Sequence, residues 1–422
     1  MNVSHNTDRE YAQKLDEQDP LRSIRDRFYI NPDEIYMDGN SLGLLSKDAE
    51  ASLARIVDEW KQLGINGWMH AQTPWFTYAE KLAAQFAPLV GAEPKEIILH
   101  ASTTVNLHAL LATFYLPQGE KRKILIESHA FPTDRYAVQS QLQSKGFDPQ
   151  QDLKKVDTLD ERDVIDAMTG DVALILLPSV LYRSGQLLDI ERLATAAYER
   201  EIVIGFDCSH SVGAVPHSFS NLYVDFGCWC TYKYCNSGPG GIAGLYVNQK
   251  HFNKKPALTG WFGSAKEKQF DMSYQLEPAG NAGAWQLGTP HILSLAPLEG
   301  ALHIINETGI NTIREKSLRL TDYLMFLIDR ELTPYGFEIV TPPEPERRGG
   351  HVALTHANAV QINKALKAKG IVSDFRLPDI IRLAPVALYN TFSEVWQVVR
   401  TLKTIMQTGE YRNYQSERGI VA

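Results

Sequence analysis

Cysteine is scarce in this sequence: only four occur among 422 residues, and all lie between Cys208 and Cys235. A disulfide framework spreads its bridges over a chain and does not confine them to one short segment. The clustering therefore excludes a disulfide-stabilised scaffold and favours a reducing compartment, which we expect to be the cytoplasm.

Long hydrophobic runs are also missing. The most hydrophobic stretch, residues 172–181, is interrupted by Pro178, whereas a membrane-spanning helix needs about 20 apolar residues. The first residues, MNVSHNTDRE, show neither the basic nor the apolar segment of a secretory signal. We therefore expect neither membrane insertion nor export.

Positive charge is not in excess, because 42 Lys and Arg face 50 Asp and Glu for a formal charge of −8. Binding to a nucleic-acid backbone depends on positive charge, so we expect no nucleic-acid partner. The content of 44% hydrophobic and 22% charged residues is typical of soluble globular proteins. At about 100–200 residues per domain, the length predicts two or three domains.

Between about residues 95 and 247, short β-branched runs alternate with segments of helical period. This pattern is typical of βαβ units and predicts an α/β fold with a mainly parallel sheet. The predicted strands are EIILHA, KILIES, VALILLP, EIVIGFD, FGCWCTY and GIAGLYV. Helices are predicted over 104–115, 133–146 with Gly146 as a C-cap, 189–201, 291–309 and 313–332, and two more over 48–92, separated by a loop at 64–75.

The segment TPPEPERRGG at 341–350 is rich in proline, glycine and charge, and strand and helix patterns resume after it. We interpret the C-terminal part as a smaller α+β domain. The predicted division is an N-terminal arm with part of the small domain at 1–60, a large domain at 61–310 and a small domain at 311–422. The first 20 or so residues are expected to be disordered.

Polar residues that follow strands are the first candidates for a site, because ligands of open parallel sheets bind beyond the carboxyl ends of the strands. Asp207 directly follows an apolar run, and Lys233 follows the next one. Asp207 could also be an N-cap, and a lysine is usually a surface residue. Together, however, a carboxylate and a partly desolvated amine are what pyridoxal 5'-phosphate (PLP) requires for its pyridinium nitrogen and its aldehyde.

A phosphate needs its own site, and Thr103 and Thr104 precede a predicted helix whose free N–H groups could receive one. Either threonine could instead be a plain N-cap. The SGPGG run is not a Walker A loop, because no Gly-Lys-Ser/Thr follows it. Cys228 and Cys230 match no ordinary zinc spacing, so we predict no metal and buried free thiols.

Several motifs together resemble the kynureninase family of PLP-dependent hydrolases. They are DGNSLGLL, FPTDRYA, DCSHSVGAVP, TYKYCNSGPGG, GWFGS, IRLAP and LYNTF, spread from about Tyr36 to Phe392. The resemblance implies fold type I, the aspartate aminotransferase-like fold, with a large PLP-binding domain and a smaller C-terminal domain. It implies cleavage of the Cβ–Cγ bond of L-kynurenine to anthranilate and L-alanine in tryptophan degradation or NAD biosynthesis.

The resemblance also implies a set of site residues. Lys233 binds the cofactor, Asp207 pairs with its ring nitrogen, Phe131 stacks on the ring, and Thr104 and Tyr232 reach the phosphate. We also expect Tyr232 to transfer a proton, because the pKa of a phenol at this place could be lowered or the phenol could act in a relay; a phosphate hydrogen bond alone is the alternative role. The cofactor-binding residues implied are Thr103, Thr104, Phe131, Pro132, Thr133, Asp134, Asp207, His210, Tyr232, Lys233, Trp261 and Thr289. Trp261 and Thr289 are expected to act across the interface of a homodimer. Arg382, Trp68 and Ser41 are the implied substrate-binding residues, with Arg382 as the clamp for the α-carboxylate.

Two positions depart from what the family shows elsewhere. Pro178 stands where some members carry a serine that contacts the phosphate, and Trp68 stands where vertebrate members carry histidine. Trp68 indicates the bacterial type, with a preference for kynurenine over 3-hydroxykynurenine, although it could simply be a packing residue.

One alternative is a cysteine desulfurase or another β-eliminating PLP lyase. Those enzymes usually have histidine before the lysine, where this chain has Tyr232, and they need a mobile loop cysteine. A second alternative is a PLP-binding protein without catalysis, which would need a broken site.

Overall fold

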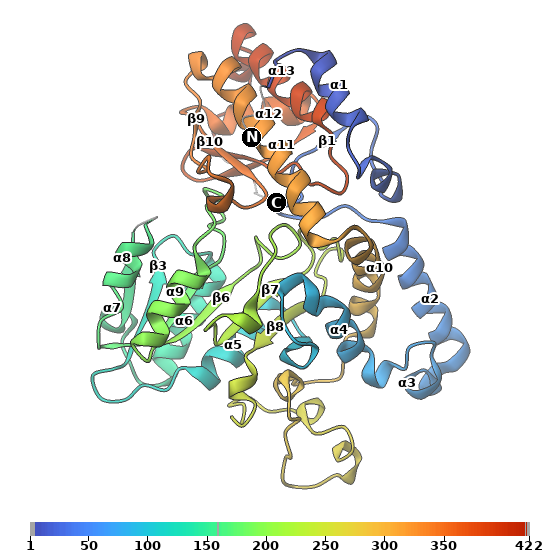
Figure 1. Cartoon of the computed structure of the whole chain (residues 1–422), viewed down its shortest axis with the longest axis vertical. Helices are drawn as coiled ribbons and strands as arrows, with labels where there is room; N and C mark the ends of the chain where they lie inside the picture. Colours follow the sequence, from blue (N-terminus) through green and yellow to red (C-terminus); the bar gives the residue numbers. More distant parts are fainter. Residues whose placement is uncertain (1–4, 158–159, 418, 420–422) are drawn as a thin grey trace.

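The computed structural model describes residues 5–157, 160–417 and 419. Its buried apolar side chains form two cores. The first lies mainly around the central sheet, between Phe28 and Ile313, and the second collects residues of both ends of the chain, from Ala12 to Tyr411. Figure 1 shows the two corresponding lobes, one around the central sheet and one built from the N-terminal and C-terminal segments.

The large lobe is built on a seven-stranded sheet with strand order β2-β8-β7-β6-β5-β3-β4. The strands are β2 (Ile97–Leu99), β3 (Lys123–Glu127), β4 (Leu153–Val156), β5 (Val172–Pro178), β6 (Val203–Asp207), β7 (Phe226–Cys230) and β8 (Ala243–Val247). β3 to β7 pair in parallel, whereas β8 pairs antiparallel with both β2 and β7. The predicted α/β class with a mainly parallel sheet is confirmed.

Helices cover the sheet on both faces, as the alternating pattern predicts (Figure 1). They are α4 (Tyr78–Val90), α5 (Thr103–Phe114), α6 (Pro132–Ser144), α7 (Pro149–Asp152), α8 (Glu161–Asp166) and α9 (Ile190–Glu199). α5 packs on β7 and β8, and α9 packs on β6. The C-cap of α6 is Lys145 and not Gly146 as predicted; Gly146, with φ +83°, is the next residue and turns the chain away from the helix.

Further helices flank the sheet and join the lobes. α2 (Lys47–Leu63) packs along α10 (Ile292–Thr308), and α11 (Ile310–Glu331) continues from α10 after Gly309 into the second core. The predicted loop at 64–75 contains a short helix, α3 (Gly67–His70), so that expectation is only partly right. None of these helices, nor any other in the described residues, is long and apolar enough to cross a membrane.

The small lobe combines two sheets with helices. Strands β12 (Asp374–Arg376), β13 (Ile380–Leu383), β10 (Val352–Thr355) and β9 (Glu338–Ile339) pair antiparallel in that order, and β1 (Ile35–Tyr36) pairs in parallel with β11 (Ile371–Val372). The helices are α1 (Arg9–Glu17), α12 (Ala359–Ala368) and α13 (Phe392–Thr408). The lobe is α+β as predicted, while the division at residues 60 and 310 stays a prediction.

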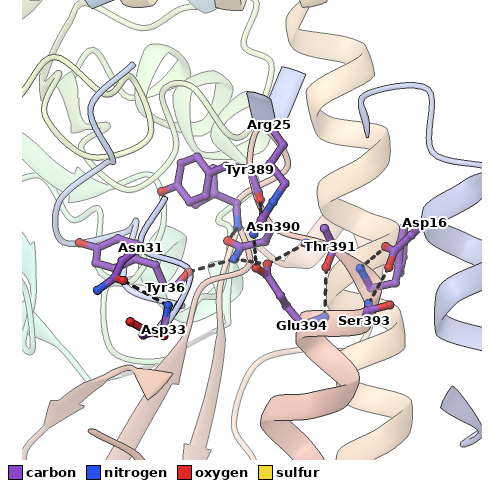
Figure 2. Close-up of polar contacts among 12 residues, drawn as sticks. Asp16, Arg25, Asn31, Asp33, Tyr36, Tyr389, Asn390, Thr391, Ser393 and Glu394 are labelled. Atoms are coloured by element: carbon purple, nitrogen blue, oxygen red, sulfur yellow. Dashed lines mark hydrogen bonds and ion pairs between the residues drawn. The ribbon is translucent and has the colours of Figure 1, made fainter. Parts of the chain in front are cut away.

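Ion pairs and helix caps attach the N-terminal segment to α13. Both carboxylate oxygens of Asp16 accept backbone N–H groups, from Phe392 at 2.6 Å and Ser393 at 3.0 Å, and Arg25 pairs with Glu394 at 2.6 Å (Figure 2). Thr391 caps the same helix. The expectation of disorder in the first 20 residues is wrong for the described part, because these contacts and the apolar face of α1 hold it against the small lobe.

Candidate active site

The ends of two parallel strands bring Asp207 and Lys233 to one edge of the sheet. Asp207 is the last residue of β6 and pairs in register with Cys228 of β7, which ends three residues before Lys233. The Lys233 amine lies 3.0 Å from His210 Nε2 and 5.9 Å from the centre of the Phe131 ring. Two predicted site residues, His210 and Phe131, therefore flank the Lys233 amine, and Asp207 lies at the same edge of the sheet, as the rule for parallel sheets leads one to expect.

Two carboxyl groups meet beside this amine. Asp134, in the first turn of α6, is buried, and its pKa is raised well above the usual value by burial and by the charge of Asp207 and a hydrogen bond to it. The Asp207 carboxylate also accepts the backbone N–H of Ser209 at 2.8 Å. Residues 208–215 form turns and no helix, so the interpretation of Asp207 as an N-cap is wrong. With its pKa raised, Asp134 holds its proton more tightly than an ordinary carboxyl group does.

His210 and Tyr232 are both neutral in this environment. Burial, and next the Lys233 ammonium, hold the pKa of His210 well below its ordinary value. Burial raises the pKa of the half-buried Tyr232 phenol. Tyr232 is therefore a proton donor in this state, and the downward perturbation considered from the sequence does not occur.

The predicted phosphate threonines stand at the starts of two neighbouring helices. The N-cap of α5 is Ser102, whose Oγ accepts the Val105 N–H at 3.4 Å, so neither Thr103 nor Thr104 is the cap. The Thr104 and Thr133 hydroxyls lie 3.5 Å apart, joining α5 to α6, which has Pro132 at its first position. Exposed hydroxyls and free helix N–H groups together suit an anion.

The predicted carboxylate clamp, Arg382, is buried on β13 and is held from three sides. Its Nε lies 2.8 Å from Asp374 Oδ2, its Nη1 donates to the Tyr182 carbonyl at 2.8 Å, and its Nη2 donates to the Ser41 hydroxyl at 3.2 Å. Asp374 thus compensates its charge by contacting both Nε and Nη2, while the other contacts of Nη1 and Nη2 are to the neutral Tyr182 carbonyl and Ser41 hydroxyl. A substrate carboxylate can replace these neutral partners at the Nη1 and Nη2 edge.

Three predicted residues lie outside this group within one chain. Trp68 packs edge-on against Trp75, with ring centres 6.0 Å apart, and lines an apolar cavity of about 630 Å³. Trp261 is 48% exposed, and Thr289 is exposed as well. Residues 259–277, the projecting segment, extend from the large lobe (Figure 1). No contact in the described part of the chain joins these three to Lys233.

The four cysteines are buried free thiols, as predicted. Burial raises the pKa of Cys208, Cys228 and Cys235, which keeps these thiols protonated. No three His, Cys, Asp or Glu side chains gather as a metal site in residues 5–157, 160–417 and 419.

Sequence reasoning missed several residues of the site. Tyr182 stands edge-on to Phe131, with ring centres 5.5 Å apart, and its carbonyl binds Arg382. Asp374 faces Arg382 across the β12–β13 pair. Tyr182 follows a predicted strand, which is a usable signal, whereas the position of Asp374 depends on a hairpin register that the sequence does not reveal.

Two buried polar atoms beside Lys233 lack a hydrogen-bond partner among the described residues and so allow the fit of the predicted cofactor to be tested. Asp134 Oδ1 and His210 Nδ1 are buried and have no hydrogen-bond partner in the described part of the chain. Buried polar atoms are normally satisfied, so these two indicate a ligand or water beside Lys233. An amine, a carboxyl pair, an aromatic face and an anion site together match the aldehyde, ring nitrogen, ring face and phosphate of PLP.

Comparison with known proteins gives the family. Kynureninases from Geobacillus thermodenitrificans (strain NG80-2) and Bacillus thuringiensis subsp. konkukian (strain 97-27) are 56% and 55% identical to the chain over 418 residues, with 98% of this chain and 98% of each relative covered. The family model described as the kynureninase C-terminal domain matches residues 313–402.

Solved structures share the fold at low identity. A mutant of C-DES with glycine covalently linked to its PLP cofactor has a TM-score of 0.76 and 18% identity, covering 90% of this chain and 98% of that one. A cysteine desulfurase from Thermococcus onnurineus NA1 has a TM-score of 0.75 and 18% identity, with 92% and 98% covered. These structures confirm the predicted fold type, and the full-length identity to curated relatives shows that the chain belongs to the kynureninase family.

Proposed function

We propose that this protein is a PLP-dependent hydrolase that cleaves the Cβ–Cγ bond of L-kynurenine to anthranilate and L-alanine, in tryptophan degradation or NAD biosynthesis. The observation that carries the proposal is the position of Lys233, beside the Asp134–Asp207 pair and His210, in a chain 56% identical to a kynureninase. A cysteine desulfurase activity has only fold-level support, and the four cysteines are buried, so none is a mobile sulfur acceptor.

Residues at the starts of two helices and after two strands would hold the cofactor. Lys233 would bind its aldehyde, the Asp134–Asp207 pair its ring nitrogen and Phe131 one ring face, while Thr104 and Tyr232 would meet its phosphate. Thr103, Pro132, Thr133 and His210 complete the proposed set. When bound, PLP supplies an electron sink that stabilises carbanions next to the substrate nitrogen.

The side chains of the chain supply binding and proton transfer. Arg382 would bind the α-carboxylate at its Nη1 and Nη2 edge, with Ser41 beside it. The free Lys233 amine would take the proton from Cα. The neutral His210 next to it adds no positive charge that would oppose protonation of the amine. Tyr232, whose phenol keeps its proton, would donate at the γ-oxygen as water adds to that carbonyl.

We further propose a homodimer in which Trp261 and Thr289 of each chain complete the partner's phosphate site. The projecting segment carries large exposed apolar side chains, including Trp261, Phe270, Met272 and Tyr274. Apolar groups gathered on one projection favour burial against a partner. Trp68 would then line the substrate site from the apolar cavity.

The free thiols support a reducing compartment, which we propose to be the cytoplasm.

The decisive experiment adds L-kynurenine to the PLP-loaded protein and follows the fluorescence of released anthranilate. Lys233→Ala should lose turnover and the visible absorption of the bound cofactor while it stays folded. Lys81→Ala, at an exposed position of α4, is the matched control and should behave as wild type.

Each result has a clear meaning. Cofactor absorption without anthranilate would move the function to another PLP lyase, which release of sulfur from L-cysteine would then identify. Normal turnover by Lys233→Ala would contradict the proposal that the Lys233 amine binds the cofactor and takes the Cα proton. No cofactor absorption in the wild type after addition of PLP would remove the enzyme proposal altogether.

A further inference from the structure

His351 is a buried imidazole that the proposed chemistry leaves unused. It directly precedes β10 in the small lobe and has no exposed surface. Neither Nδ1 nor Nε2 makes a hydrogen bond of good geometry with the described residues, although the ring lies close enough to the Tyr182 carbonyl for a weak hydrogen bond to raise its pKa. Because a buried polar atom is seldom left unsatisfied, both nitrogens indicate a ligand or ordered water next to this ring.

The ring lies at the junction of the two lobes, against the loop that follows β5. A Cβ atom added to Gly185 would come within 2.7 Å of the His351 carbonyl oxygen and 3.2 Å of His351 Nε2, and Gly185 has φ +75°, so glycine lets this loop pack closely against His351. The Tyr182 carbonyl of the same loop accepts Arg382 Nη1 at 2.8 Å and raises the pKa of His351. His351 and Arg382 are therefore neighbours around one carbonyl oxygen.

The His351 ring is also linked to the Lys233 amine through His210. The His351 and His210 ring centres are 5.9 Å apart, and His210 Nε2 lies 3.0 Å from the Lys233 amine. The charged groups that act on His351 are Arg382, Lys233 and Arg376, all of them cationic, and together with burial they lower its pKa well below the ordinary value. A neutral imidazole with one N–H to donate thus lies among three cationic side chains, two of which, Arg382 and Arg376, share the single carboxylate of Asp374.

We infer that His351 is a substrate-binding residue that donates a hydrogen bond to the α-carboxylate held by Arg382. The inference rests on the proposed function and names how its carboxylate is recognised. An anion is the ligand that the cationic side chains around this ring favour, and a carboxylate accepts about four hydrogen bonds, of which the Nη1 and Nη2 edge of Arg382 supplies two. Because Asp374 occupies the Nε side of Arg382, the carboxylate meets the other edge, beside the Tyr182 carbonyl where His351 lies.

A purely structural role predicts something different. If ordered water satisfies both nitrogens, replacing His351 changes the stability of the lobe junction and weakens all ligands alike. If the N–H binds the carboxylate, the loss is confined to ligands that carry one. Two ligands that differ only in the carboxylate therefore separate the two roles.

The experiment titrates the PLP-loaded protein with L-alanine, the proposed product, and with ethylamine, which is L-alanine without its carboxylate, and follows the cofactor absorption. His351→Phe keeps a ring and removes both nitrogens, while His351→Gln keeps a donor. We expect His351→Phe to weaken L-alanine binding by about tenfold or more and to leave ethylamine binding within about twofold. His351→Gln should stay within about threefold of wild type for both ligands.

Equal weakening of the two ligands, or unchanged binding of L-alanine by a folded His351→Phe, would overturn the inference. If the phenylalanine variant does not fold, His351→Leu is titrated in the same way. These titrations need no cleavage of kynurenine, so a wild-type protein that binds L-alanine but releases no anthranilate would refute the proposed function and still test His351.

Discussion

At the scale of single residues, Arg382 combines a binding role with a structural one. Replacing it by alanine removes the charge-assisted bonds to the α-carboxylate, so KM for L-kynurenine should rise by about tenfold to a hundredfold. The affinity for PLP should change little, because no cofactor-binding residue in the proposed set contacts Arg382. Steady-state kinetics and PLP titration of the same variant check both statements.

The partners of Arg382 provide the control. Arg382→Lys keeps the charge beside Asp374 but not the planar fork, so it should fold better than Arg382→Ala and still bind substrate poorly. Equal loss of cofactor and substrate affinity in both variants would contradict a clamp and indicate a residue that only supports the lobe junction.

His100 gives the molecule a pH-dependent stability with a definite sign. Burial lowers its pKa to about 4 from 6.5, and its Nε2 accepts the Leu287 N–H at 3.1 Å. Between pH 4 and pH 6.5 the imidazole binds more protons in the unfolded chain than in the folded one. Its contribution to the free energy of unfolding is therefore largest above pH 6.5 and decreases as the pH falls towards 4. The His100 share of that loss should be about 2 kcal/mol from pH 7 to pH 5.

Urea unfolding of wild type and His100→Gln at the two pH values tests this. Glutamine keeps an acceptor for Leu287 but does not titrate, so its loss from pH 7 to pH 5 should be smaller than that of wild type. Identical losses would show that the imidazole is not the group responsible.

What the sequence revealed about these residues depended on position along the chain. Lys233 and Asp207 could be predicted because each follows an apolar run, and parallel strands bring their carboxyl ends together. Asp374 and His351 could not, because their neighbours are fixed by the β12–β13 hairpin and by the packing of two lobes. The cofactor-binding residues at the ends of strands could therefore be predicted from the sequence, whereas the residues around the substrate carboxylate, Asp374 and His351, could not.

At the scale of elements, the start of α13 is fixed by a residue near the other end of the chain. Asp16 accepts two backbone N–H groups of that helix (Figure 2). Asp16→Ala should lower the free energy of unfolding by about 0.5–2 kcal/mol, because the helix loses an N-terminal acceptor and a favourable charge. Chemical denaturation measures the change.

The neighbouring residue offers the control for this cap. Glu17 is exposed and also acidic, so Glu17→Ala removes the same charge without removing a contact and should change stability by less than about 0.5 kcal/mol. Asp16→Asn keeps an acceptor oxygen and should fall between the two. If Glu17→Ala costs as much as Asp16→Ala, net charge and not the cap is responsible.

Most elements followed from local pattern, and the exceptions have physical causes. All six predicted strands occur, but β4 was missed because two of its four residues are lysines on an edge strand, where one side is solvated. The cap of α5 fell one residue earlier than expected, on Ser102, since Ala101 with φ +49° turns the chain just before it. Local sequence fixes the type of element better than its first residue.

At the scale of the whole molecule, one chain holds only part of the proposed site. Lys233 and Arg382 lie where the lobes meet, whereas Trp261 stands half-exposed on the projecting segment with no contact to them in the described residues. In the proposed homodimer a second copy of the chain supplies the missing residue, and a two-fold dimer completes two such sites at once.

This arrangement makes a quantitative prediction for mixed dimers. Lys233→Ala and Trp261→Ala should each have little activity alone. After unfolding and refolding together in equal amounts, half of the dimers contain one chain of each kind, and in these one of the two sites has both an intact Lys233 and an intact Trp261. Activity should therefore recover to about a quarter of wild type, because the other site of each mixed dimer carries both substitutions. If each site were built within one chain, mixing would restore nothing, since every chain carries one of the two defects.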